Sequence, residues 1–358
     1  MGFLSQLIAG PPPRAGGLQG TAQMIGGAGG FSDAGVEVNE ERSLQVGAAF
    51  ACINFISRTS GMLSRKIVNR EDLNRREVRT AEFEHIWGPA NPSTSGLSFW
   101  ESLFASAEGW GNGYAWEGRD DRVRYNPREP WKGVRELWFT HPRRVQVGQL
   151  EDGTKGFMLD GNRAKPLTTE QLVHFPSLSV DGVRGLSPVK AAANAMGLQI
   201  AAERFGSLFF RNGSTLSGII TSEAVVEPHQ AKAVLETWDE EHQGLNNAHL
   251  MGVLGGNAKY EKVGIPPNEA QFLETRMFQR EEIVQFYAPI PHHLLGWKSN
   301  TSNFGTGIES QGIHVVMFVL LNRLRRVEEV VEQFLLPPEL QLKFLSLIHI
   351  SEPTRLRR

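Results

Sequence analysis

Residues 268–309 read NEAQFLETRMFQREEIVQFYAPIPHHLLGWKSNTSNFGTGIE. The spacing of apolar side chains predicts an amphipathic helix over 268–288, and Pro289 and Pro291 end it. A polar, glycine-bearing loop follows, and a second long helix is expected over 307–335. Because loops held by rigid elements often carry function, we expect the function of this chain to reside in this loop.

Composition sets broad limits on the chain. At 358 residues and 40% hydrophobic content, it is long enough for two or three hydrophobic cores. Its 37 basic and 39 acidic residues argue against an autonomous nucleic-acid-binding domain. The single cysteine, Cys52, lies in the apolar run VGAAFACINFI, which predicts a buried thiol and a reducing environment for folding. No apolar run approaches the ~18 residues of a membrane span, so no membrane partner is expected.

Residues 1–43 are expected to form a flexible arm. Glycine and proline dominate residues 10–36, and such a composition does not repay the entropy of ordering. A phosphate-binding loop is the alternative, but no Gly-Lys-Ser/Thr follows the glycines. The arm is therefore the favoured interpretation.

The patterns within residues 44–186 predict an α+β domain. Helical spacing over 44–63 predicts one helix, and Ser98 with Glu101 has the spacing of a capping box for a second, ending near Gly109. The charged stretch 65–79 is expected to be a solvated loop or an edge strand. Strand-like runs separated by turn residues then predict an antiparallel sheet from ELWFTHPRRVQVG (136–148), GFMLDG (156–161) and LVHFPSL (172–178).

Two long helices are expected to flank a small insert. Ser187 and Pro188 predict the start of a helix that continues to residue 212. Residues 214–266 are expected to form a β-α-β insert, with strands at LSGIIT (216–221) and HLMGVLGG (249–256) and a helix over 228–243. The helix 268–288 is expected to bury an apolar stripe of Leu273, Met277, Val284 and either Tyr287 or Ala288. The helix 307–335 is apolar around much of its circumference and is expected to be mostly buried.

No catalytic, cofactor or metal site is predicted. The chain lacks the His-Glu-x-x-His, Cys-x-x-Cys, Gly-x-Ser-x-Gly and Walker lysine patterns. His292 and His293 are the best metal candidates, but no further ligand lies at a suitable spacing. Glu240, Glu241 and His242 are expected on a solvated helix end.

Five blocks carry a resemblance to the portal proteins of long-tailed, siphovirus-type bacteriophages, from about Val46 to Phe344. Each block alone is weakly specific, but their order along the chain matches the family. The blocks are AFACINFISR (49–58), PANPSTSGLSFWESLFASAEGWGNGYAW (89–116), LVHFPSLSVDGVRGLSPVKAAANAMGLQIAAERFGSLFFRNG (172–213), NEAQFLETRMFQREEIVQFYAPIPHHLLG (268–296) and TSNFGTGIESQGIHVVMFVLLNRLRRVEEVVEQFLL (301–336).

The resemblance implies a portal fold of class α+β. Its parts would be a wing domain (44–186), a first stem helix (187–213), a clip domain (214–266), a second stem helix (267–288), a tunnel loop (289–304) and a long helix returning to the wing (305–345). It also implies a homo-oligomeric ring of about twelve subunits at one capsid vertex of the virion, assembled in the bacterial host cytoplasm. Double-stranded DNA would pass transiently through the bore, with the terminase large subunit, a head-tail adaptor and the major capsid protein as partners. ATP hydrolysis would belong to the motor, so no enzymatic activity and no cofactor are implied.

The same resemblance suggests site residues. The tunnel loop would offer polar groups for brief phosphate contacts from Lys298, Asn300, Thr301, Ser302 and Asn303. The alternative is that these five residues form only a solvated turn. On the second stem helix, Glu274 and Glu281 would repel phosphates if they face the bore, and Arg276 and Arg280 would pair between subunits. A near-neutral chain suits a conduit, because a strongly basic bore would hold DNA through counterion release.

Two alternatives to a portal subunit remain open at this point. One is another head-tail connector component, and the other is a phage-encoded enzyme such as a nuclease or peptidase. The ending SLIHISEPTRLRR (346–358) resembles translated sequencing-adapter read-through, so it is expected to be a non-native tail without structure or function, and the alternative is a natural basic tail.

Overall fold

The computed structural model of the chain describes residues 30–72, 76–150, 153–162, 166–211, 218–221, 229, 232–233, 259–262, 269–297 and 306–345. These residues form two compact units, and the structural statements below concern them alone. Unit 1 contains Val38–Ala192 and the chain from Val284 onward, and unit 2 contains Phe31–Glu37 and Ala193–Ile283. The predicted tail 346–358 lies outside the described residues, as does the arm up to residue 29.

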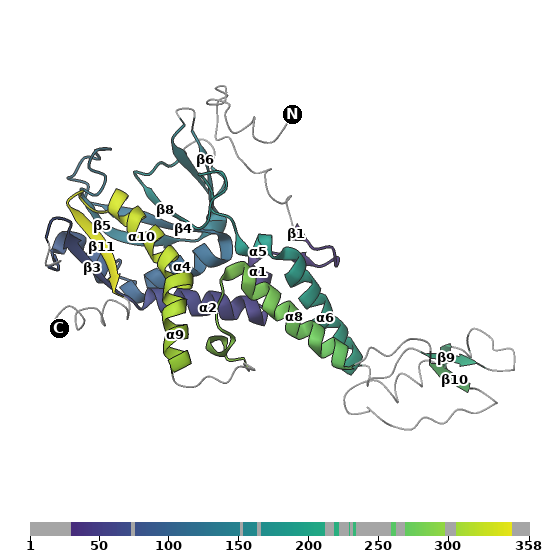
Figure 1. Ribbon diagram of the computed structural model, residues 1–358. Coiled ribbons are helices and arrows are strands. Elements are labelled where there is room, and N and C mark those ends of the chain that lie inside the picture. Colours follow the sequence, from purple (N-terminus) through teal and green to yellow (C-terminus); the bar gives the residue numbers. More distant parts are fainter. Residues whose placement is uncertain are drawn as a thin grey trace, which may run out of the picture. The chain divides into compact units, whose positions relative to one another are not determined.

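Unit 1 mixes helices and antiparallel strands, as the α+β prediction requires (Figure 1). Its elements in chain order are α1 (Glu40–Ser43), α2 (Gly47–Gly61), β3 (Ser64–Asn69), η2 (Ala81–Phe83), α3 (Glu84–Trp87), α4 (Gly96–Trp110), β4 (Asn112–Arg119), β5 (Val134–Thr140), η3 (Pro142–Arg144), β6 (Val145–Gln149), β7 (Lys155–Leu159), β8 (Leu172–Pro176), α5 (Pro188–Ala191), η4 (His292–Leu295), α9 (Thr306–His314), η5 (Val315–Leu320), α10 (Leu321–Phe334) and β11 (Leu340–Leu345).

The predicted flexible arm ends earlier than expected. The short strands β1 (Gly30–Phe31) and β2 (Glu37–Val38) pair with each other, and α1 follows immediately. The side chain of Asn39 caps α1 by accepting a hydrogen bond from Arg42 N at 2.9 Å. The prediction of a flexible arm to residue 43 is therefore wrong for its last residues, because this local cap and strand pair order them.

Helices α2 and α4 form the centre of the helical core (Figure 1). Helix α2 buries Cys52 and Ile56, and α4 buries Phe99 and Trp100, whose rings meet edge to face at 5.2 Å. The predicted buried thiol is confirmed, and burial raises the pKa of Cys52 to about 12.

The predicted capping box of α4 is wrong by one helical turn. Helix α4 begins at Gly96, and Ser95 is its cap, accepting a hydrogen bond from Ser98 N at 3.1 Å. Ser98 is therefore already inside the helix. The earlier start is favoured because Ser95 has the extended backbone that a cap requires, with φ −62° and ψ 151°.

A three-stranded antiparallel sheet, ordered β5-β4-β8, lies beside this core. The antiparallel strands predicted over 136–178 are confirmed, but the first predicted run divides at Pro142 into β5 and β6. Strand β6 pairs with β7 instead, in a separate two-stranded sheet. The central strand β4 was not predicted. Tyr114 of β4 pairs with Thr140 of β5 on one side and with His174 of β8 on the other.

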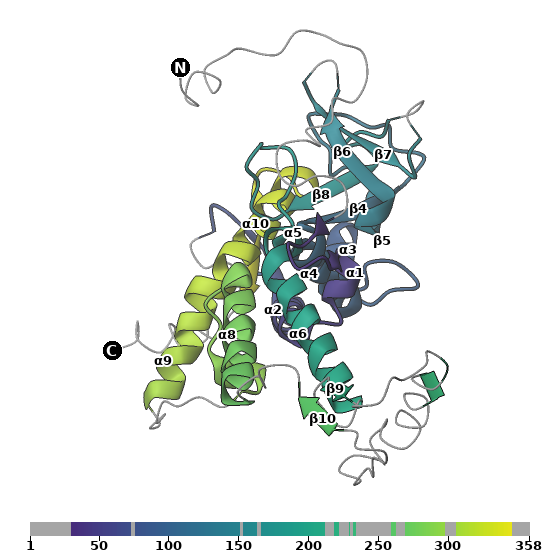
Figure 2. The same cartoon turned by 90° about the vertical axis from the view of Figure 1, so that its right-hand side faces the viewer.

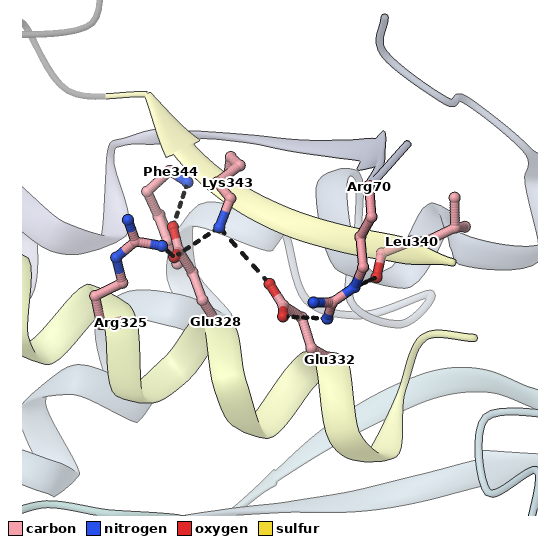
Figure 3. Close-up of polar contacts among 7 residues, drawn as sticks. All are labelled: Arg70, Arg325, Glu328, Glu332, Leu340, Lys343 and Phe344. Carbon is pink, nitrogen blue, oxygen red and sulfur yellow. Dashed lines mark hydrogen bonds and ion pairs between the residues drawn. The ribbon is translucent and has the colours of Figure 1, made fainter. Parts of the chain in front are cut away.

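Strand β3 is an edge strand of another two-stranded sheet, in which it pairs with β11. Polar contacts then hold β11 against helix α10 (Figure 3). The carboxylate of Glu328 accepts a hydrogen bond from Phe344 N at 3.0 Å and lies 3.4 Å from Lys343 Nζ. Glu332, one turn later, pairs with Arg70 at 2.6 Å. These contacts tie residues near both ends of the described chain into one unit, and β3 buries Ile67 and Val68 beneath them.

The predicted helix over 307–335 is present, but it is not uniform. A π-helical segment, η5, separates α9 from α10. One face buries Val315, Val319 and Val327, as predicted. The prediction of a mostly buried helix is wrong for its other face, because Met317 is 50% exposed and Phe318 is 60% exposed.

Unit 2 contains α6 (Ala193–Arg211), β9 (Gly218–Thr221), β10 (Lys259–Lys262) and most of α8 (Glu269–Tyr287). The predicted first helix does start at Ser187, whose Oγ accepts from Lys190 N at 3.3 Å. It is not continuous, because a break at Ala192 separates α5 from α6. The strand predicted at 216–221 appears as β9, which pairs with β10. The strand predicted at 249–256 and nearly all of the helix predicted over 228–243 lie outside the described residues.

The side chain of Asn112 organises the junction between α4, β4 and the segment that precedes α5. Its Oδ1 accepts hydrogen bonds from His174 Nε2 at 2.9 Å and from Gly185 N at 2.8 Å. Its Nδ2 donates to Gly185 O at 3.1 Å and to Trp110 O at 3.0 Å. Because Asn112 Oδ1 can only accept, His174 carries its proton on Nε2.

Acid is expected to destabilise unit 1 through His174. Burial, and secondarily the nearby Lys155, lower the pKa of His174 from 6.5 to about 3, although Asp181 acts in the opposite direction. In the unfolded chain the imidazole of His174 is therefore protonated below about pH 6.5. In the folded chain it stays neutral down to about pH 3. Over that interval this group should lower the free energy of unfolding by about 1.4 kcal/mol per pH unit as pH falls.

Urea denaturation from pH 7 to pH 4.5 measures this effect, with His174→Gln as the control. Glutamine offers an N–H to Asn112 but does not titrate, so the variant should lose less stability than the wild type as pH falls. Parallel pH profiles for the two proteins would contradict the assignment.

Candidate functional site

Helix α8 carries a largely polar and exposed surface. Glu274, Arg276 and Glu281 are exposed along it. The predicted apolar stripe is confirmed for Val284, Tyr287 and Ala288, which are buried in unit 1. It is wrong for Met277, which is 52% exposed beside Phe278 at 68%, and the side chain of Leu273 lies outside the described part.

Polar groups join α6 to α8 in unit 2, and the two helices lie side by side in both views (Figure 2). Glu203 Oε1 of α6 accepts hydrogen bonds from Gln199 Nε2 at 3.2 Å and from Arg276 Nη2 of α8 at 3.4 Å. Gln279 of α8 is only 1% exposed. An ion pair thus links the two helices, and the apolar side chains Leu198, Phe205 and Leu208 of α6 are about half exposed.

Apolar side chains exposed on both helices are informative. Soluble monomers rarely expose contiguous apolar surface, and larger exposed patches mark interaction sites. A helix pair with exposed apolar side chains is suited to packing against further copies or partners.

The structure places the predicted stem residues as follows. Glu274 and Glu281 are exposed on α8, as a surface role requires. Arg276 contacts Glu203 of the same chain, in a pair in which both side chains are about 40% exposed. Arg280 is half-buried. The structure of one chain thus supplies Arg276 with an intrachain partner, which sequence reasoning had not considered.

The five predicted loop residues Lys298, Asn300, Thr301, Ser302 and Asn303 lie outside the described residues. The part before them is a compact turn, in which η4 ends at Gly296 with φ +77° and Trp297 N donates to His292 O at 3.1 Å. The rings of His292 and Trp297 lie 5.7 Å apart. Within the described ranges, no three histidine, cysteine or acidic side chains gather in a group that would hold a metal ion.

A buried ion pair joins α4 to α10 and was not predicted. Arg323 Nε lies 2.6 Å from Glu108 Oε1, and Arg323 Nη2 lies 2.9 Å from Glu108 Oε2. Arg323 also donates to Val319 O and to Tyr287 O. The signal in the sequence was a single acid in the apolar run FASAEGW and an arginine in the apolar run VLLNRL, since buried charges require partners.

Comparisons with known proteins agree with this architecture. The chain is 29% identical over 92% of its length to a probable portal protein of Streptomyces phage phiC31, covering 73% of that protein. It is 23% identical over 84% of its length to the portal protein of Enterobacteria phage HK97, covering 69% of that protein.

Solved structures with the same fold include a phage portal protein. A crystal structure of an HK97-family phage portal protein from Corynebacterium diphtheriae matches with a TM-score of 0.62 at 13% identity, over 86% of this chain and 95% of that chain. A chain from the neck of an empty gene transfer agent particle matches with a TM-score of 0.59 at 20% identity, over 88% and 87% of the two chains. These likenesses define the fold as the α+β portal fold.

The family follows from the sequence match. The model of the phage portal protein family matches residues 47–349, which is most of the chain. The chain belongs to the phage portal protein family. Portal proteins are structural components that form a ring-shaped channel at a capsid vertex, through which DNA is packaged and ejected. None of the helices in the described ranges is long and apolar enough to cross a membrane.

Proposed function

We propose that this chain forms a ring of about twelve copies at one capsid vertex, with α6 and α8 as stem helices around the DNA bore. The observation that carries the proposal is the family match over residues 47–349. In this arrangement unit 1 supplies the wing (44–186 with 305–345), the helices at 187–213 and 267–288 form the stem, residues 214–266 form the clip, and residues 289–304 form the tunnel loop.

The surface of α8 supports a stem that lets DNA slide. Glu274 and Glu281 are exposed, and carboxylates facing the bore would repel phosphates. Net charge is only −2 for the whole chain, so no large basic excess holds DNA through counterion release. Arg276 and Arg280 pair with acidic groups across the subunit interface, and Arg276 exchanges its contact with Glu203 for one on the neighbour.

The tunnel loop makes brief, non-specific contacts with phosphates. Its residues Lys298, Asn300, Thr301, Ser302 and Asn303 offer one cation and several short hydrogen-bonding groups, which position a backbone without reading sequence. The compact turn at His292–Gly296 supports this role, because it belongs to unit 1 and fixes one end of the loop there.

Replacing Thr301, Ser302 and Asn303 together with alanine should leave rings intact and lower the amount of DNA packaged. Rings persist because stem and wing surfaces hold them together, whereas packaging falls because the loop loses its polar contacts. Electron microscopy of the rings and a nuclease-protection packaging assay measure the two effects. Alanine at the exposed wing residues Asp121 and Arg122 is the control, and packaging that matches this control would refute the loop assignment.

The partners follow from the same assignment. The clip docks the terminase large subunit during packaging and a head-tail adaptor afterwards, while the wing faces the major capsid protein. Assembly takes place in the bacterial host cytoplasm, and ATP hydrolysis belongs to the motor. Negative-stain microscopy of the purified protein tests the ring directly, because the proposal requires particles with a central channel and a protein that stays monomeric would contradict it.

A further inference from the structure

A cavity lies in unit 1 between strand β8 and helix α10, which pack against each other (Figure 2). Its volume is about 600 Å³, within the range of about 300–1,000 Å³ that is typical of small-molecule sites. The helix lines it with residues whose spacing places them on one face: Arg326, Glu329, Val330 and Gln333. A different face of α10 carries Glu328 and Glu332, which hold β11 and Arg70 (Figure 3). The wall of the cavity is therefore distinct from the contact between α10 and β11.

His174 of β8 contributes a buried imidazole to this wall, with only 5% of the residue exposed. Its Nε2 donates to Asn112 Oδ1 at 2.9 Å, and its ring stacks on Tyr114 with the ring centroids 4.8 Å apart. These two contacts fix the tautomer and the plane of the imidazole. Nδ1 then carries a lone pair, and within the described part of the chain it accepts no hydrogen bond. Because an unsatisfied buried acceptor is costly, a ligand that brings an N–H or O–H donor to Nδ1 would be favoured.

Two cationic side chains line the same cavity, Lys155 at the start of β7 and Arg326 on α10. Both are partly buried, and neither forms a hydrogen bond or an ion pair among the described residues. Burial lowers the pKa of His174 and the charge of Lys155 lowers it further, so Lys155 and His174 lie near each other. Glu329 is the acidic member of the described lining and is exposed to solvent. The cavity therefore joins a net positive charge to a buried acceptor, which together select an anion with a donor group.

We propose that this cavity binds a small oxyanion that carries its own O–H group, of which hydrogen phosphate is the simplest. Lys155 and Arg326 attract the negative oxygens, and the O–H of the ligand donates to His174 Nδ1. Sulfate has the same tetrahedral shape but no O–H at neutral pH, and a phosphodiester of DNA also lacks one. Either would place an oxygen lone pair against the lone pair of Nδ1. The cavity is larger than a phosphate ion, so water or the rest of a larger hydroxyl-bearing oxyanion fills the remainder. The inference does not rest on the ring assembly.

Isothermal titration calorimetry of the full-length chain tests this site, with inorganic phosphate and sulfate as the two probes at pH 7 and constant ionic strength. Phosphate should bind saturably, with about one ion per chain. Sulfate should bind about tenfold more weakly or worse, because it leaves the buried acceptor on His174 unsatisfied. Equal affinities for the two anions would overturn the proposal, since cations alone attract both. The absence of saturable phosphate binding would overturn it as well.

Two single variants locate the binding in this cavity. Lys155→Gln and Arg326→Gln each remove one cation and should each weaken phosphate binding by about tenfold or more, while the preference over sulfate persists because it depends on His174. The control is Lys132→Gln, which removes the same charge at an exposed residue outside the described lining and should bind phosphate as the wild type does. If both cavity variants bind phosphate as tightly as this control, the proposal is wrong. The portal assignment would still stand, because microscopy of the rings tests it separately.

Discussion

Replacing Arg323 with leucine is expected to lower the free energy of unfolding by about 3–5 kcal/mol. The side chain of Glu108 is 5% exposed and that of Arg323 is 18% exposed, so the variant leaves a carboxylate without its partner inside unit 1. The carbonyl oxygens of Val319 and Tyr287 lose a donor at the same time. Urea denaturation followed by tryptophan fluorescence measures the loss.

Two controls separate the buried charge from the loss of packing. The double variant Glu108→Leu with Arg323→Leu removes both charges and should recover much of the stability, since apolar replacements of buried pairs are often neutral. Glu129→Ala removes a surface pair with Lys132, whose side chains are 37% and 51% exposed, and should cost under about 1 kcal/mol. If the double variant is as unstable as Arg323→Leu, the uncompensated charge is not the cause.

Long periodic elements were the most predictable part of this fold. The helix expected over 268–288 is observed as Glu269–Tyr287, because its spacing and the prolines after it are local signals. The break at Ala192 carries no such signal, since alanine is the best helix former. The start of α5 is held instead by Ser187 Oγ, which donates to Gly109 O, a contact across 78 residues that no local pattern records.

The central strand β4 was missed for a related reason. Its sequence NGYAWEGR begins like a turn and contains no β-branched residue, so its intrinsic preference for a strand is weak. Pairing with β5 and β8 on both sides makes it a strand. Likewise, the partner of Glu108 lies 215 residues away.

For the candidate site, the sequence predicted the order of helix, loop and helix but not which surfaces the single chain leaves open. Apolar periodicity predicted a buried Met277 and a mostly buried helix over 307–335, but it does not show whether the same chain or another chain buries them. Met277 and, on that helix, Phe318 are at least half exposed in one copy. A ring-forming subunit uses the same apolar signal for its own core and for its neighbours, so a single sequence does not separate the two.

Replacing Gly185 with alanine is expected to cost about 3 kcal/mol or more, because it forces rigid backbone apart. A Cβ at Gly185 would lie 1.8 Å from Gly111 O and 2.8 Å from Ser177 N. Neither atom is free to move, since Ser177 N already donates to Gly111 O at 2.9 Å. The amide of Asn112 also holds Gly185 through its N–H and its carbonyl, so any shift breaks buried hydrogen bonds.

The matched control for this variant is Gly109→Ala, in the last turn of α4. A Cβ there meets nothing within 4 Å, so the variant should be neutral or more stable by up to about 1 kcal/mol, as expected for alanine over glycine in a helix. Urea midpoints of the two variants measured together test the argument. If Gly185→Ala unfolds at the wild-type midpoint, the close approach of the two backbones is not what holds the segment before Ser187. If it unfolds early while Gly109→Ala does not, the approach of Gly185 to Gly111 holds the segment before Ser187, where α5 begins.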